Sequence, residues 1–256
     1  MRKIWIFALV GAVALAAAAV ALAQTGTKQT ITASVKTGSG KPKASKHGTL
    51  SINLSASDPT NSSHFNQPDP ARQLDVSLPK GLKLDTKSAP TCSATDGDFS
   101  TKGDQACPSK SKIATGSAVI NTGLAPPVTR INATVEGFDG GKTLILYVVP
   151  QGAQPIVIRA KITGSAKRGM HLTVNVPPNC IPPGRPTDNP PCGGKEAPIE
   201  TFILNTLAKH TGSGSKRHDL VTTPSSCPSK GWKFAAKVTF AHIPPQNVST
   251  QVSCRK

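Results

Sequence analysis

Apolar and polar side chains alternate with a period of two through most of the chain after residue 29. The stretch 49–55 reads TLSINLS, and the stretch 232–240 reads WKFAAKVTF. Because successive side chains of a strand point to opposite faces, this pattern predicts strands with one buried face. No segment beyond the N-terminus sustains the 3.6-residue period of an amphipathic helix, and 22 Gly and 23 Pro supply turns. The chain is therefore predicted to be all-β.

The strand candidates are short, and turn signals recur roughly every 8–15 residues, a spacing typical of β-sandwiches. We expect two immunoglobulin-like or related β-sandwich modules with long loops, one over 24–108 and one over 109–256. Their boundary is placed near the non-periodic segment 86–115. The continuous apolar run Leu144–Val149 predicts a central strand covered on both faces. The alternation on either side of a basic tip predicts a hairpin over 155–178.

The N-terminus has the layout of a secretory signal. Arg2 and Lys3 precede an uncharged run over 4–23, which ends in the small-residue pattern Ala-Leu-Ala. We interpret residues 1–23 as a signal peptide. An uncleaved anchor is the alternative, because the run is just long enough to span a bilayer and would be the only membrane contact. Either way the remainder is expected outside the cell, as an extracellular or cell-surface protein.

All six cysteines follow this segment, and their number is even. In an oxidising compartment this predicts three disulfides. Fifteen pairings are possible on paper. The order of the cysteines and the expected strand layout favour the sequential pairing Cys92–Cys107, Cys180–Cys192 and Cys227–Cys254. No C-x-x-C motif is present, and the thiols are too far apart in sequence for a zinc knuckle, so we expect structural cross-links without metal or cofactor.

Charge is the strongest compositional signal. The chain carries 30 Lys and Arg against 13 Asp and Glu, a net charge of +17 that falls to +15 without Arg2 and Lys3. Such a charge attracts polyanions, although it also serves solubility. Three loops concentrate basic residues and are expected to meet at one end of a sandwich. The candidate polyanion-binding residues are Lys36, Lys41, Lys43, Lys46, Lys161, Lys167, Arg168, Lys209, Lys216 and Arg217.

No catalytic signature of a serine hydrolase, a zinc protease or a P-loop enzyme occurs in the sequence. The acidic segment TDGDFSTKGD, residues 95–104, lacks the spacing and closing Glu of a calcium loop and is interpreted as a solvated turn. Specific nucleic-acid recognition is not expected, because there is no groove-reading helix and few aromatic residues for base stacking. We therefore expect a protein that is not an enzyme. A triad assembled in space stays open as an alternative.

Three stretches resemble a set of secreted actinobacterial proteins of unknown function: LPKGLKLDTKSAPTC at 78–92, ACPSKSKIATGSA at 106–118 and CPSKGWKFAAKVTF at 227–240. Ala114 stands where the resemblance leads us to expect Gly. The resemblance implies an exported, disulfide-bonded, β-rich protein and no biochemical activity. Together these features predict a structural or adhesive protein that binds anionic cell-envelope polymer or other surface proteins. The alternative is a secreted hydrolase that acts on an envelope polymer.

Overall fold

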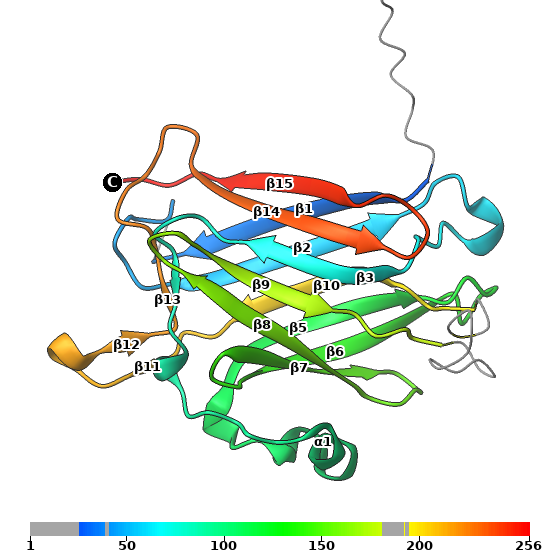
Figure 1. Ribbon diagram of the computed structural model, residues 1–256, viewed down its shortest axis with the longest axis horizontal. Coiled ribbons are helices and arrows are strands. Elements are labelled where there is room, and N and C mark those ends of the chain that lie inside the picture. Colours follow the sequence, from blue (N-terminus) through cyan, green and yellow to red (C-terminus); the bar gives the residue numbers. More distant parts are fainter. Residues whose placement is uncertain (1–25, 39–40, 181–191, 193–194) are drawn as a thin grey trace, which may run out of the picture.

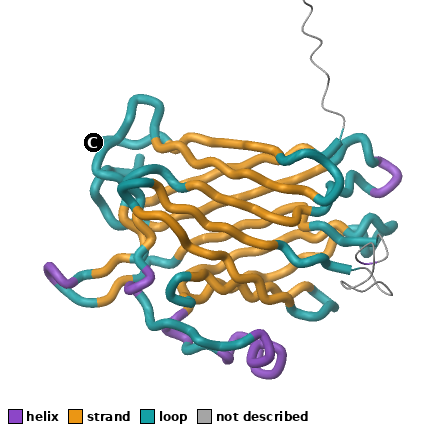
Figure 2. The backbone as a smooth tube through the Cα atoms, viewed as in Figure 1, coloured by secondary structure: helices purple, strands orange, loops and turns teal. Residues whose placement is uncertain are grey.

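The computed structural model describes residues 26–38, 41–180, 192 and 195–256. The predicted signal or anchor, residues 1–23, lies outside this range. Strands make up 50% of the chain and helices 11%, so the predicted all-β class is confirmed. The helices are short and lie in the connections outside the sheet (Figure 2).

The long strands are β1 (Lys28–Lys36), β2 (Thr49–Ser57), β3 (Ala71–Ser77), β5 (Lys112–Asn121), β6 (Arg130–Asp139), β7 (Thr143–Pro150), β8 (Ile156–Ser165), β9 (Gly169–Asn175), β10 (Ile199–Thr206), β14 (Trp232–Phe240) and β15 (Gln246–Val252). Short strands are β4 (Lys83–Leu84), β11 (His210–Thr211), β12 (His218–Asp219) and β13 (Val221–Thr222). The helix α1 spans Asp96–Lys102, and 3₁₀ turns occur at η1 (Ser62–His64), η2 (Thr86–Ser88), η3 (Gly103–Ala106), η4 (Ser109–Ser111) and η6 (Gly214–Lys216).

The eleven long strands form one sheet in the order β1-β2-β10-β5-β6-β7-β8-β9-β3-β14-β15 (Figure 1). The sheet curls into a nearly closed, barrel-like form in which β1 lies beside β15. Each neighbouring pair is antiparallel. Strand direction therefore alternates across an odd number of strands, so that β1 and β15 run in the same direction where they meet.

The two edge strands are joined at both ends of their contact. At the start of both strands, the main-chain N–H of Gln29 donates to Oε1 of Gln246 at 3.0 Å. Beyond their far ends, the backbone of Arg255 bonds to Pro42 (2.9 Å) and Ala44 (3.1 Å). These contacts cover backbone groups that an open sheet edge would expose to other chains.

The alternating pattern places one set of side chains inside the curled sheet. Trp232 and Phe234 of β14 point inward and are 2% and 0% exposed, while Lys233 points outward. The predicted hairpin is confirmed as β8 and β9 with a turn at 166–168. Leu144–Val149 lies in β7 and contributes alternately to the interior core and to a second cluster on the outer face, as predicted.

The sequence predicted two sandwich modules, 24–108 and 109–256. The structure instead has one large eleven-stranded sheet and two small sheets, β11-β12 and β13-β4. The strands of residues 24–108 do not form a unit of their own, because they pair with strands of residues 109–256. β3 lies between β9 and β14, and β2 pairs with β10. Alternation shows that a segment is a strand and which face is buried, but it does not identify the partner strand. A single curled sheet buries the same faces as two packed sheets.

The segment 92–107 forms a flap on the outer face of β7. Its Cys92–Cys107 disulfide and Phe99 pack on Phe138 and Tyr147, with the Phe99 and Tyr147 ring centroids 5.2 Å apart. The segment 95–104 is mostly exposed, as expected, but it is not a turn, because α1 begins there with a reciprocal cap between Thr95 and Asp98. One helix of seven residues is too short to show a helical period.

The sequential disulfide pairing is confirmed for all three bonds, Cys92–Cys107, Cys180–Cys192 and Cys227–Cys254. The third bond joins the segment before β14 to the residue pair after β15, as expected from the pairing of these two strands. Within the residues that the structure describes, no helix is both long enough and apolar enough to cross a membrane.

Candidate functional site

The alternating strand directions divide the connections between two ends of the sheet. One end, called the basic end, contains the β1–β2 connection (37–48), the β8–β9 turn (166–168) and the β11–β12 segment (207–219). These connections lie together at the left of Figure 1. The opposite end, called the cavity end, contains the connections 58–70 and 241–245. From the sequence we expected the three basic loops to lie together at one end of a sandwich. The structure places them at the same end of the sheet.

Most of the predicted basic residues are exposed at this end. The exposed members are Lys36, Lys41, Lys43, Lys46, Lys161, Lys167, Arg168, Lys216 and Arg217, whereas Lys209 is half-buried. Among ion pairs between described residues, one involves this set: Arg217 lies 2.8 Å from Asp219. Arg217 is therefore partly neutralised, and the lysines supply most of the positive field.

The basic end also gathers cations that the sequence analysis did not single out. They are Lys80, Lys83, Lys87, Lys142, Lys230, Arg255 and Lys256, in the segments that precede or follow strands at this end. Only the direction of the adjoining strand shows that these residues lie at the same end of the sheet as the predicted basic loops.

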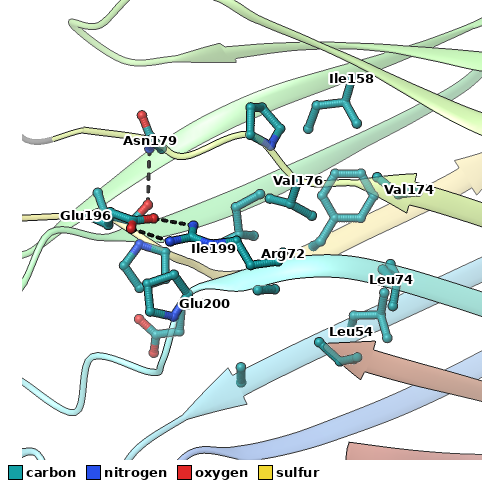
Figure 3. A pocket seen from close by; sticks show the side chains of 18 of the residues that line it. Leu54, Arg72, Leu74, Ile158, Val174, Val176, Asn179, Glu196, Ile199 and Glu200 are labelled. Carbon is teal, nitrogen blue, oxygen red and sulfur yellow. Dashed lines mark hydrogen bonds and ion pairs between the residues drawn. The ribbon is translucent and has the colours of Figure 1, made fainter. Parts of the chain in front are cut away.

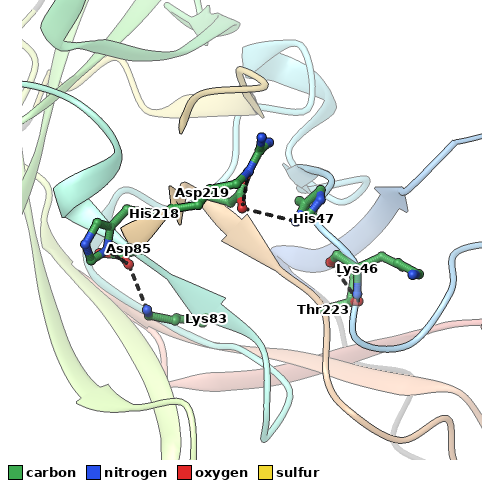
Figure 4. A network of polar contacts seen from close by, with 8 residues as sticks. Lys46, His47, Lys83, Asp85, His218, Asp219 and Thr223 are labelled. Atoms are coloured by element: carbon green, nitrogen blue, oxygen red, sulfur yellow. Dashed lines mark hydrogen bonds and ion pairs between the residues drawn. The ribbon is translucent and has the colours of Figure 1, made fainter. Parts of the chain in front are cut away.

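Two carboxylates hold the segments that cover the basic end (Figure 4). Asp85 accepts from Nζ of Lys83 at 2.7 Å and lies 2.9 Å from Nδ1 of His218. Asp219 contacts Arg217 and lies 3.1 Å from Nδ1 of His47. These pairs connect β4, β12 and the β1–β2 connection.

Both carboxylates are ionised in this setting. Burial raises the pKa of Asp85, but hydrogen bonds from Lys83 and His218 offset that effect, and the pKa lies below its usual value. The hydrogen bond from Arg217 lowers the pKa of Asp219 in the same way. Each carboxylate neutralises a neighbouring cation, Lys83 or Arg217, so the net positive charge at this end comes from the remaining lysines.

Asp139 is a third carboxylate toward this end and has a different environment. It is 0% exposed, and Oδ1 accepts a 2.6 Å hydrogen bond from the main-chain N–H of Gly141. Oδ2 is buried and has no hydrogen-bond partner among the described residues. Burial raises the pKa of Asp139 to about 6, and the charge of Asp85 adds to this shift.

An apolar cavity of about 100 Å³ lies inside the sheet toward the cavity end (Figure 3). Its walls come from β2, β3, β8, β9 and β10 and include Leu54, Leu74, Ile158, Val174 and Phe202. The alternation in 49–55 and 155–178 predicted that Leu54, Ile158 and Val174 lie on buried faces. It does not indicate that a space remains between them.

Charged residues surround the entrance to this cavity. Arg72 of β3 forms a bidentate pair with Glu196, whose side chain is 7% exposed against 28% for Arg72. Glu200 accepts from Nε of Arg130 at 2.7 Å. Gln67 donates to the main-chain oxygen of Glu196 at 3.0 Å. Glu196 and Glu200 therefore each have an arginine partner.

One arrangement bears on the hydrolase alternative. On the outer face of β3 and β9, Nδ1 of His171 lies 2.8 Å from Oδ1 of Asp75 and 3.3 Å from Oγ of Ser77. In a Ser–His–Asp relay the acid and the serine contact opposite ring nitrogens. Here both approach the same nitrogen, so Ser77 is not positioned to pass its proton through the ring toward Asp75.

No group of three or more His, Cys, Asp or Glu side chains that could hold a metal ion occurs within the described ranges. No family model matches the sequence, and neither a curated protein nor a solved structure is significantly similar to the chain.

Proposed function

We propose that this is an exported, non-enzymatic protein of structural or adhesive type that binds an anionic polymer of the cell envelope through the basic end. The observation that carries the proposal is the common direction of the strands that lead into the three basic loops. Exposed lysines more than 100 residues apart in sequence, such as Lys41 and Lys167, are thereby gathered on one end of a rigid sheet.

The charge balance at the basic end supports this proposal. Single exposed ion pairs contribute only about 0–1 kcal/mol each, so one lysine would hold a polyanion weakly. Many lysines at one end act together on a polymer that presents repeated negative charges. The acids that lie among them, Asp85 and Asp219, are already paired with cations of the same chain.

Export is part of the same proposal. Three disulfides suit an oxidising compartment outside the cytosol. The N-terminal segment 1–23 would deliver the chain there as a signal peptide.

The test compares two variants that lose the same charge at different ends. In K41Q/K167Q/K216Q, one lysine is removed from each basic loop. In K28Q/K195Q/K237Q, three exposed lysines away from the basic end are removed. Binding to dextran sulfate and to washed cell-envelope material is measured by co-sedimentation across a salt series.

We expect the basic-end variant to bind about 10- to 100-fold more weakly at low salt, since three contacts of about 0.5–1 kcal/mol are lost. The control variant should stay within about twofold of the wild type. Binding of the wild type should fall steeply as salt rises. Equal losses in the two variants would mean that net charge alone is responsible. Salt-resistant binding to envelope material would indicate a specific partner, such as another surface protein.

A further inference from the structure

We propose that the cavity end is a binding site for a short alkyl chain whose polar head group is uncharged. The site consists of the 100 Å³ cavity and the polar residues Arg72, Glu196 and Asn179 at its edge (Figure 3). It lies at the end of the sheet opposite the basic loops, so it is independent of polyanion binding.

The size and lining of the cavity determine the apolar part of the ligand. Protein interiors are close-packed, and voids much larger than a water molecule are few. An apolar cavity of this order stays dry and accepts small apolar molecules. The walls are formed by side chains such as Leu54, Ile158, Val174 and Phe202. They offer dispersion contacts and no hydrogen bonds, which suits a chain of about four to six carbon atoms.

The entrance determines the head group. A free guanidinium there would select a carboxylate, and a free carboxylate would select an amine. Instead, Arg72 is bound to Glu196 through two hydrogen bonds, and Glu200 is bound to Arg130. A charged head group would have to displace one of these partners and leave it unpaired.

Two uncharged side chains also line the cavity, Gln29 and Asn179. Their NH2 groups donate to the main-chain oxygens of Thr30 and Ala197, and their carbonyl oxygens can accept a hydrogen bond from a hydroxyl head group. The nearby ion pairs keep the opening in place, because Arg72 joins β3 to the segment before β10. The site is thus an apolar chamber inside a sheet with a fixed polar rim, an arrangement common in ligand pockets.

The test uses 1-hexanol as the probe and hexanoate as its charged counterpart. Methyl chemical shifts of the purified protein are followed by NMR during each titration. We expect 1-hexanol to cause saturable shifts at Val174 and Ile158. The methyls of Leu204 and Leu220, beside a smaller internal space of about 30 Å³ at the other end, should stay unchanged. Hexanoate should bind at least about tenfold more weakly.

Two substitutions locate the site. Val176→Phe should fill the cavity near its entrance and abolish the shifts. The matched control Val128→Phe places the same ring on a residue that is 49% exposed, and it should leave binding unchanged. Phe202→Leu should enlarge the cavity and shift the preference toward 1-octanol, which provides a test should Val176→Phe not fold. Unchanged binding in Val176→Phe, or shifts without saturation, would overturn the site. Equal binding of hexanoate would overturn the uncharged head group.

Discussion

The indole Nε1 of Trp232 donates a 2.8 Å hydrogen bond to the main-chain oxygen of Ser226, while the ring is only 2% exposed. Ser226 directly precedes Cys227, so this bond joins the first residue of β14 to the loop that carries the Cys227–Cys254 disulfide. The ring fills the interior of the sheet near the basic end. The aromatic residue thus connects the core to the covering loop through one side chain.

Replacing Trp232 separates the two contributions of this side chain. Trp232→Ala should lower the free energy of unfolding by about 3–5 kcal/mol, because it leaves a large cavity in the core. Trp232→Phe keeps part of the ring and loses the donor, so the loss should be smaller, about 1–3 kcal/mol. Urea unfolding followed by circular dichroism measures both values. An unchanged midpoint in Trp232→Ala would contradict the burial of the ring.

The sequence was sufficient to predict features that depend on local pattern. Period-two alternation located the strands that became β2 and β14, and the predicted basic tip at 164–169 contains the turn that closes the β8–β9 hairpin. The disulfide pairing also followed from order along the chain. In each case the partners are close in sequence or the signal lies within one strand.

Features that join distant segments were not predictable in the same way. Arg72 and Glu196 are 124 residues apart, and no periodicity in either segment indicates that they meet. The single sheet depends on β3 entering between β9 and β14. Alternation contains no information about this choice, because each strand would bury the same face against any partner.

Asp139 should make the protein less stable as the pH rises. Its pKa is about 6 in the folded chain against 3.8 as the reference value, so the folded state binds more protons between these limits. The free energy of unfolding therefore decreases from about pH 4 to pH 6 and then levels off. Asp139→Asn should remove this dependence and stabilise the protein at pH 8 by up to about 3 kcal/mol, the free energy that corresponds to this pKa difference. Thermal melting of the wild type and of Asp139→Asn at pH 4.5 and pH 8 measures this stabilisation. An equal stabilisation at both pH values would contradict the role of ionisation.

Asp85 should have the opposite dependence on pH. Its pKa lies below the usual value, so the stability that it contributes is present above about pH 4 and is lost as the pH falls through the folded pKa. Asp85→Asn should cost about 1–3 kcal/mol at pH 7, because Lys83 and His218 lose a buried acceptor. Asp104→Asn, at an exposed carboxylate, is the control and should change stability by less than about 0.5 kcal/mol. Equal effects of the two substitutions would show that Asp85 does not hold the covering segments.

The disulfides should protect different parts of the molecule. Removing Cys227–Cys254 as C227S/C254S frees the end of β15, an edge strand of the sheet, and the bond spans 27 residues. Chain-entropy arguments give a loss of about 3–4 kcal/mol. Removing Cys92–Cys107 as C92S/C107S loosens the flap on the outer face of β7, which lies outside the interior core. Hydrogen exchange should therefore rise in β14 and β15 for the first variant and in α1 for the second. Uniform acceleration across the sheet in both variants would contradict this division, because it would mean that the flap and the edge strand unfold only together with the core.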